Sequence, residues 1–233
     1  MSKSPPLKPY DPGQALFALH IPKTGGTSLR SVLAAWFGDN LRLHYRRGGA
    51  LQRRVAFGPG SCVYGHFNGL RGFGIQAYYP EARQCITMLR EPYARFLSQW
   101  RFHQQQRQQG AVIETDVEPT FDRWIHRRAE EMARGCNSFS FLCHFPRELT
   151  AENVRAVLDE YFIFIGILER LGPSMTALAR ALGRRPMLIP HVNATIGAHY
   201  PEYRSFYETH FALEHAVYAR CLELNARLIE YYR

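Results

Sequence analysis

A lysine, two glycines and three hydroxyl side chains stand together near the start of the chain. The segment reads Lys23-Thr24-Gly25-Gly26-Thr27-Ser28. Glycines let the backbone approach a ligand closely, and the backbone N–H groups of such a turn, with a lysine beside them, are suited to binding a phosphate or another anion. The sequence therefore predicts an anion site whose contacts are Lys23, Thr24, Gly25, Gly26, Thr27 and Ser28.

A strand and a helix are expected to hold this loop. The apolar run 15–19 has the length of a strand and breaks at His20-Ile21-Pro22. After the loop, residues 26–36 carry Leu29, Val32 and Leu33 at helical spacing. Strand, loop and helix in this order direct a helix N-terminus and several N–H groups at one ligand.

The position of the lysine argues against a nucleoside triphosphatase. A Walker A loop places its lysine after the glycines, whereas Lys23 precedes Gly25 and Gly26. The later predicted strands, at 85–89 and 162–166, do not end in an acid placed to hold magnesium. A P-loop nucleotide kinase-like enzyme stays open as an alternative.

The remaining pattern predicts an α/β fold. Further strands are expected at 61–66, 85–89 and 162–166, with the segment 39–60 as a loop and the C-terminal segment, 201–233, as two helices that meet near Phe211. This order predicts a P-loop-like parallel sheet of about four to five strands with helices on both faces and a ligand at the carboxyl ends of the strands. Residues 1–14 are expected to form an extended arm, and 15–233 a single domain.

Composition adds a preference for anionic partners. The 233 residues are 46% hydrophobic and 21% charged, which is typical of a globular protein, and the net charge is +9. The densest basic run, Arg42 to Arg54, could line a groove for an anionic glycan or form a solvated loop. A basic module that binds a polyanion without catalysis is thus a further hypothesis about function. No nucleic-acid motif is present, so no nucleic acid is expected as a partner.

The cysteines and the hydropathy of the chain give expectations about metal sites, membrane segments and cellular location. Five cysteines without a CxxC pair give no sign of a metal site. The N-terminal segment has no apolar core, and no apolar run approaches the roughly 20 residues that span a membrane, so a cytoplasmic protein is expected. The sequence does not indicate an oligomeric state.

Two segments resemble known cofactor-binding motifs. The first, HIPKTGGTSLRSVL, closely resembles the 5′-phosphosulfate loop of sulfotransferases, in the form typical of the branch that includes heparan sulfate 2-O-sulfotransferase and its bacterial relatives. The second, CITMLREPYARFLSQW, resembles the 3′-phosphate element of that family, in which a serine follows eight residues after an arginine. Arg90 and Ser98 stand at these two positions.

Four further segments extend the resemblance over most of residues 15–230. Residues 63–70 are similar to the His-Gly-His segment of the family, 136–145 to an Asn-containing stretch, and 164–171 to a Gly-x-x-Glu strand end. Residues 190–195 match a loop that tends to close over the nucleotide, which adds Asn193 and Thr195 as candidate contacts.

The resemblance implies an activity. A sulfuryl group would pass from 3′-phosphoadenosine 5′-phosphosulfate to an acceptor, expected to be a sugar or glycan hydroxyl, and adenosine 3′,5′-bisphosphate would leave, with no metal involved. Lys23 would bind the oxygen that bridges phosphate and sulfur, and Arg90 and Ser98 would bind the 3′-phosphate. The acceptor itself, and the choice between O- and N-sulfation, are not readable from the sequence.

A histidine is expected to act as the base. On a strand, Tyr64 and His66 point to the same face, and they stand where the family has its His-Gly-His pair, with Tyr64 at the position of the presumed base. A neutral histidine titrates near the pH of the reaction, whereas tyrosine titrates near pH 10. His66 is therefore the first candidate and His20, beside Lys23, the second; either could instead be structural.

Overall fold

Five parallel strands form the sheet at the centre of the fold. The structure is a computed structural model that describes residues 4–45, 53–110, 118–189 and 199–233. The strands are β1 (Leu16–Leu19), β2 (Leu41–His44), β3 (Cys62–Gly65), β4 (Cys85–Leu89) and β5 (Phe162–Ile167). They lie side by side in the order β2-β3-β1-β4-β5. The predicted parallel sheet of four to five strands is confirmed.

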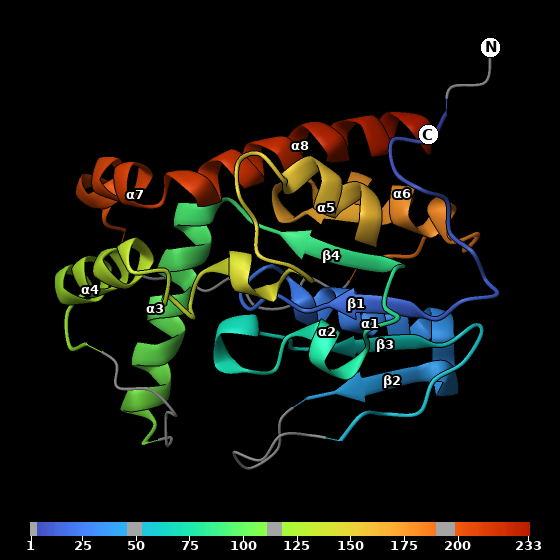
Figure 1. The fold of residues 1–233 in the computed structure, drawn as a ribbon, viewed down its shortest axis with the longest axis horizontal. Helices are drawn as coiled ribbons and strands as arrows, with labels where there is room; N and C mark the ends of the chain where they lie inside the picture. The colour runs from blue at the N-terminus through green and yellow to red at the C-terminus, as the bar shows by residue number, and fades with distance from the viewer. Residues whose placement is uncertain (1–3, 46–52, 111–117, 190–198) are drawn as a thin grey trace.

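Helices flank this sheet, and every secondary-structure element that follows β5 in the described chain is helical (Figure 1). The α-helices are α1 (Gly26–Phe37), α2 (Ile75–Tyr78), α3 (Pro92–Gln108), α4 (Phe121–Ala133), α5 (Val154–Tyr161), α6 (Leu171–Ala181), α7 (Arg204–His210) and α8 (Ala212–Tyr231). Short 3-10 turns are η1 (Gly38–Asn40), η2 (Gly69–Arg71), η3 (Phe141–His144), η4 (Leu168–Arg170) and η5 (Pro201–Tyr203). Helices α7 and α8 meet at Phe211, as predicted.

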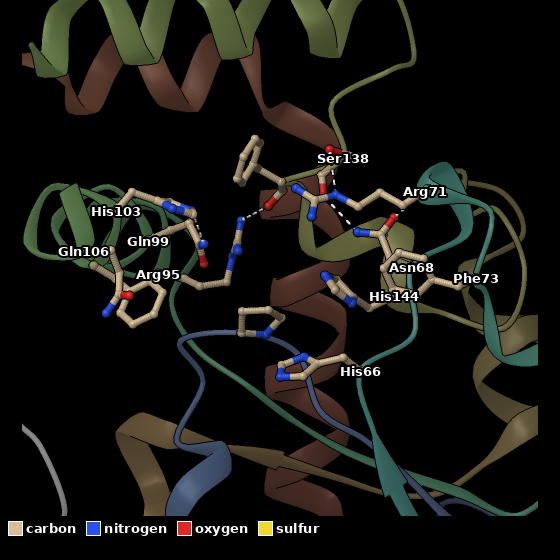
Figure 2. A pocket seen from close by; sticks show the side chains of 13 residues that line it. His66, Asn68, Arg71, Phe73, Arg95, Gln99, His103, Gln106, Ser138 and His144 are labelled. Atoms are coloured by element: carbon tan, nitrogen blue, oxygen red, sulfur yellow. Dashed lines mark hydrogen bonds between the residues drawn. The ribbon is translucent and has the colours of Figure 1, made fainter. Parts of the chain in front are cut away.

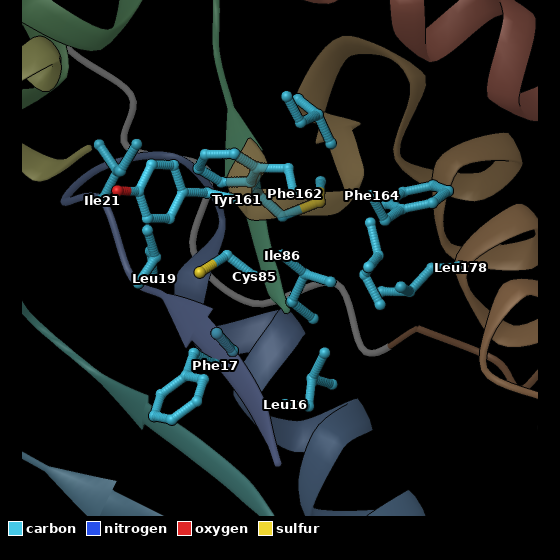
Figure 3. Close-up of a cluster of buried hydrophobic side chains, with 14 of the residues drawn as sticks. Leu16, Phe17, Leu19, Ile21, Cys85, Ile86, Tyr161, Phe162, Phe164 and Leu178 are labelled. Atoms are coloured by element: carbon cyan, nitrogen blue, oxygen red, sulfur yellow. The ribbon is translucent and has the colours of Figure 1, made fainter. Parts of the chain in front are cut away.

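The central strands are apolar because both of their faces are covered. Every residue of β1, β4 and β5 is buried, which is the pattern of a parallel sheet between two layers of helices. Side chains of β1 and β5 belong to one hydrophobic core (Figure 3), which includes Phe17, Phe162 and Phe164. A second apolar cluster joins α3, α4 and α7 through Phe96, Trp124 and other rings.

One expectation about the strands was wrong. Residues 41–44 lie inside the segment predicted as a loop, yet they form β2 and pair in parallel with β3. β2 is the edge strand of the sheet, and its Arg42 is exposed. The strand therefore has the weak apolar pattern that is typical of an edge strand. The strand predicted at 162–166 is confirmed as β5, which continues one residue further, to Ile167.

Three further expectations concern the N-terminal arm, membrane-spanning segments and the basic run 42–54. The structure describes these parts of the chain incompletely. Residues 4–14 contain no helix or strand, although Leu7 is buried against the core. None of the helices in the described ranges is both long and apolar enough to cross a membrane. Of the basic run 42–54, residues 46–52 lie outside the described part, and Arg54 pairs with Glu81.

Candidate functional site

The carboxyl ends of three neighbouring strands bring the candidate residues to one edge of the sheet. His20 follows β1, His66 follows the last residue of β3, and Arg90 follows β4. Because β1 lies between β3 and β4 and all three run in parallel, these residues meet at the same edge. This edge is where open α/β sheets bind their ligands.

The loop between β1 and α1 closes tightly on His20. Gly25 has φ +83, a left-handed conformation that favours glycine, and a Cβ at Gly26 would lie 1.8 Å from His20 Nε2. Lys23 is the one non-glycine residue with positive φ in the described ranges, at 70°. Unusual backbone conformations of this kind cluster at ligand sites, so the loop combines a strained lysine with a glycine that nothing larger can replace.

The N-terminus of α1 has no side-chain cap from its described N-cap residue, Gly25. Within this described loop, Gly25 offers no side-chain cap to the helix, and the first turn of α1 carries no acidic residue. The first N–H groups of a helix need a partner, and an anion is a favourable one. The loop is held from behind: Tyr64 Oη donates to Gly26 O at 2.7 Å, and Thr24 Oγ1 donates to Ile21 O at 2.8 Å.

These contacts separate the roles of the three hydroxyl side chains. Thr24 is buried and its hydroxyl is used inside the loop, whereas Thr27 is exposed. The Ser28 side chain is buried in the first turn of α1. Any ligand contact from Thr24 would therefore come from its backbone, and Thr27 offers the most accessible hydroxyl.

Lys23 and Arg90 are two neighbouring cations. Lys23 Nζ lies over the ring of Phe102, 4.5 Å from its centroid, a cation–π contact. Burial lowers the pKa of Lys23, and the charge of Arg90 lowers this pKa further. Burial also lowers the pKa of Arg90. An anion between the two side chains would relieve their repulsion.

Strand β4 and helix α3 fix Arg90 in place. Glu91 caps α3 by accepting from the N–H groups of Tyr93 and Ala94, and its own N–H donates to Glu169 Oε1 at 2.9 Å. The other carboxylate oxygen of Glu169 accepts from Tyr218 Oη at 3.0 Å. Glu169 is the glutamate of the Gly-x-x-Glu segment at the end of β5. Its hydrogen bond to Glu91 stabilises the turn that carries Arg90.

Arg90 lines a cleft of about 300 Å³ beside α3, together with Leu97, Arg101 and Tyr200 among others. Ser98 lies two turns after Arg90 on the same chain segment, and its side chain is buried in α3. It is not among the lining residues of this cleft. Asn193 and Thr195 lie outside the described residues.

The two candidate bases stack on each other. The rings of His20 and His66 are 4.1 Å apart between centroids at 28°. Tyr45 Oη is hydrogen-bonded to His20 Nδ1 at 3.0 Å, and the ring of Tyr64 lies 5.2 Å from that of His20. Tyr64 and His66 therefore both lie against His20, which agrees with their expected common face.

Both histidines are neutral at pH 7. Burial lowers the pKa of His66 to about 4, although a hydrogen bond to the His20 backbone opposes the shift. Burial, followed by the neighbouring His66, lowers the pKa of His20 well below its usual value. A neutral imidazole can accept a proton.

His66, and not His20, lines a second cleft of about 290 Å³ (Figure 2). Pro22 and Phe102 line the same cleft, so it opens next to the Lys23 loop. The other lining residues were not among the site residues predicted from the sequence, although several lie in the same segments as those candidates. They are Asn68, Arg71, Phe73, Arg95, Gln99, His103, Gln106, Ser138, Phe139 and His144.

The described residues contain no group of three or more His, Cys, Asp or Glu side chains that could hold a metal ion.

Comparison with known proteins identifies the fold. No family model matches the chain, and no curated protein matches its sequence. The solved structure of mouse sulfotransferase SULT7A1 complexed with PAP is similar, with a TM-score of 0.54 over 97% of this chain and 91% of that chain, at 13% sequence identity. The chain therefore has the P-loop-like fold of that sulfotransferase, which confirms the predicted fold class. The expected heparan sulfate branch stays a prediction.

Proposed function

We propose that this protein is a sulfotransferase that moves a sulfuryl group from 3′-phosphoadenosine 5′-phosphosulfate to an acceptor hydroxyl, with a sugar or glycan as the expected acceptor. One observation carries the proposal: Lys23 and Arg90 form a pair of interacting cations beside an uncapped helix N-terminus, at the ligand-binding edge of the sheet. The likeness of the fold to a structure complexed with PAP supports it.

The loop residues fit the phosphosulfate end of this donor. Lys23 would meet the oxygen that bridges phosphate and sulfur, and the N–H groups of residues 24–28 would hold the 5′-phosphate, helped by the exposed hydroxyl of Thr27. The glycines allow the close backbone approach that this binding needs. The His20 ring packs closely against Gly26, which leaves this part of the loop no room for a side chain.

Arg90 and Ser98 are proposed to hold the 3′-phosphate, which distinguishes this donor from ATP. Arg90 is held by the Glu91–Glu169 contact and is suited to an anion by its planar fork of donors. Ser98 is buried in α3, and its role here rests on its spacing from Arg90 in the sequence. Asn193 and Thr195 are proposed as further contacts on the resemblance of their loop alone.

Transfer needs charge stabilisation on one side of the sulfur and proton removal on the other. Lys23 is proposed to stabilise the negative charge that develops on the bridging oxygen as its bond to sulfur breaks. His66 would accept the proton of the acceptor hydroxyl as the oxygen of that hydroxyl forms the new bond to sulfur. In this proposal Lys23 and Arg90, rather than a metal, neutralise the donor.

The geometry favours His66 over His20 as the base. His66 lines the cleft that opens beside the Lys23 loop, so an acceptor in this cleft can reach its ring. His20 instead packs over Gly26 and is hydrogen-bonded to Tyr45. We assign His20 the positioning of the loop and of His66, and keep it as the second candidate base.

A labelled-sulfate transfer assay over glycans, lipids and small phenols tests the proposal. Wild-type protein should transfer label from the donor to at least one acceptor class. His66→Ala should lower kcat by about 10²–10⁴-fold, the usual contribution of a general base, and should leave the Kd of adenosine 3′,5′-bisphosphate unchanged. His126→Ala, at an exposed histidine of α4, is the matched control and should behave as wild type.

Two results would contradict the proposal at different levels. Normal transfer by the His66 variant would reject the base assignment alone. Magnesium-dependent ATP hydrolysis by wild-type protein, with no sulfate transfer to any acceptor, would reject the sulfotransferase in favour of the kinase-like alternative.

A further inference from the structure

The cleft beside His66 has a wall of basic side chains that the proposed transfer step does not use. Thirteen described residues line it, and they include Arg71 and Arg95 but no aspartate or glutamate. In Figure 2 the two arginines reach toward each other from opposite walls, Arg71 from the η2 turn and Arg95 from α3. The cleft is thus lined by basic side chains, and it includes His66 of the proposed transfer site.

Arg95 is built into this wall. Its side chain is 2% exposed, Nη2 donates to Phe139 O at 2.8 Å, and Nε is buried without a hydrogen-bond partner. Behind it stands Glu214, whose carboxylate lies 3.9 Å from Nη2 and accepts hydrogen bonds from Ser140 and Tyr207. A buried arginine with an unused donor is costly unless something in the cleft compensates it.

Arg71 is the less compensated of the two cations. Its Nε donates to Ser138 Oγ at 3.2 Å, and its guanidinium lies 5.1 Å from the centre of the Phe139 ring. Neither partner carries a negative charge. Asn68 holds the turn in position, because its Oδ1 accepts from the Arg71 backbone N–H and its Nδ2 donates to Ser138 O.

The positive charge of Arg71 also affects the pKa values of two histidines that line the cleft, His103 and His144. Burial lowers the pKa of His103 to about 4 and that of His144 to about 3, and in both cases the charge of Arg71 contributes to the shift. At pH 7 these rings are neutral, so they can accept or donate hydrogen bonds without adding charge. The net charge that the lining side chains present is therefore that of the arginines.

We propose that this cleft binds an anionic group of the acceptor, a carboxylate or a sulfate ester, between Arg71 and Arg95, while the hydroxyl to be sulfated lies at His66. The inference rests on the proposed sulfotransferase function and adds to it a substrate class: an acceptor that is already acidic. Arginine suits this role because its planar fork matches the two oxygens of a carboxylate.

Matched acidic and neutral sugars test the proposal directly. The p-nitrophenyl β-D-glucuronide and β-D-glucoside share their hydroxyl groups at C2, C3 and C4 and differ in a carboxylate at C6; the corresponding galacturonide and galactoside form a second pair. Their Kd values are measured by calorimetry with saturating adenosine 3′,5′-bisphosphate, which occupies the Lys23–Arg90 site. At least one acid should bind about tenfold or more tightly than its neutral partner, the usual effect of a charge-assisted hydrogen bond.

Variants at Arg71 test whether this residue causes the tighter binding of the acidic sugar. Arg71→Gln should remove the difference between acid and neutral sugar, and Arg71→Lys should restore part of it, because charge returns without the fork. Arg155→Gln, at an exposed arginine of α5 paired with Asp159, is the control and should keep the full preference. Unchanged binding of the bisphosphate by each variant shows that it is folded.

The outcomes separate this inference from the proposed function. Equal or undetectable binding of both members in both pairs, or a preference that survives Arg71→Gln, would overturn the anionic-acceptor proposal even when the bisphosphate binds well. Failure of the bisphosphate itself to bind would instead count against the sulfotransferase assignment.

Discussion

Replacement of Gly26 by alanine should disrupt the phosphate loop through a single contact. A Cβ at this position would lie 1.8 Å from His20 Nε2, 2.1 Å from Cδ2 and 2.5 Å from Cε1, whereas carbon atoms pack at about 3.5–4.0 Å. The His20 ring stacks on His66 and is hydrogen-bonded to Tyr45. It cannot turn away from the new methyl group without losing one of these contacts.

The size of the effect follows from two opposing terms. Overpacking of this kind costs about 1–3 kcal/mol of the free energy of unfolding. Gly26 is not among the described glycines with positive φ, so alanine fits its backbone, and without the clash Gly→Ala would stabilise the protein by about 0.4–1 kcal/mol. Gly26→Ala should therefore destabilise wild-type protein but stabilise the His20→Ala variant. The coupling is the difference between these two effects; it equals the cost of the clash and should be about 1–3 kcal/mol.

Urea unfolding of wild type, both single variants and the double variant measures this coupling. Gly58→Ala is the control, because a Cβ there would have no atom within 4 Å, and its effect should stay within about 0.5 kcal/mol. Titration with adenosine 3′,5′-bisphosphate should show weaker binding by Gly26→Ala than by the control. If Gly26→Ala costs the same in both backgrounds, or nothing in either, then the contact with His20 does not shape the loop.

Two further predictions concern pH. Because burial lowers the pKa of His66 to about 4, the acid limb of kcat/KM should lie near pH 4, and a limb between pH 6 and 7 would count against either this pKa or the role of His66 as base. Burial also lowers the pKa of His144 to about 3 and that of His103 to about 4. The unfolded chain takes up protons at these residues below about pH 6.5 while the folded protein does not, so stability is full above that pH and falls toward pH 4, by up to about 1.4 kcal/mol per pH unit and histidine. Urea unfolding at pH 7, 6 and 5 checks this, and a constant free energy of unfolding across the three would contradict it.

The central strands could be predicted because their physical signals are local. The runs that became β1 and β4 are short and almost entirely apolar, and they are followed by Pro22 and Pro92; both are buried along their whole length. Strand β2 escaped prediction because an edge strand buries little: it has four residues, one of them the exposed Arg42, within a basic segment. Its place depends on pairing with β3, which no local pattern records.

The same distinction divides the site. The loop around Lys23 and the turn at Arg90 are continuous motifs, so their residue types and spacing were readable. The basic wall of the cleft is assembled over long distances: Arg71 meets Ser138 across 67 residues, and Arg95 meets Phe139 across 44. Tyr45 reaches His20 only because β2 joins the sheet. Such contacts follow from the fold rather than from any one stretch of sequence.

The most direct test of the central claim is thermal unfolding with two nucleotides at equal concentration. Adenosine 3′,5′-bisphosphate, at about 100 times its Kd, should stabilise the protein by about 2.7 kcal/mol and raise the Tm accordingly. ATP, which lacks a 3′-phosphate for Arg90, should raise it much less, and Arg90→Gln should remove most of the difference while the control Arg155→Gln keeps it. Equal stabilisation of wild-type protein by the two nucleotides would contradict the proposed sulfotransferase site.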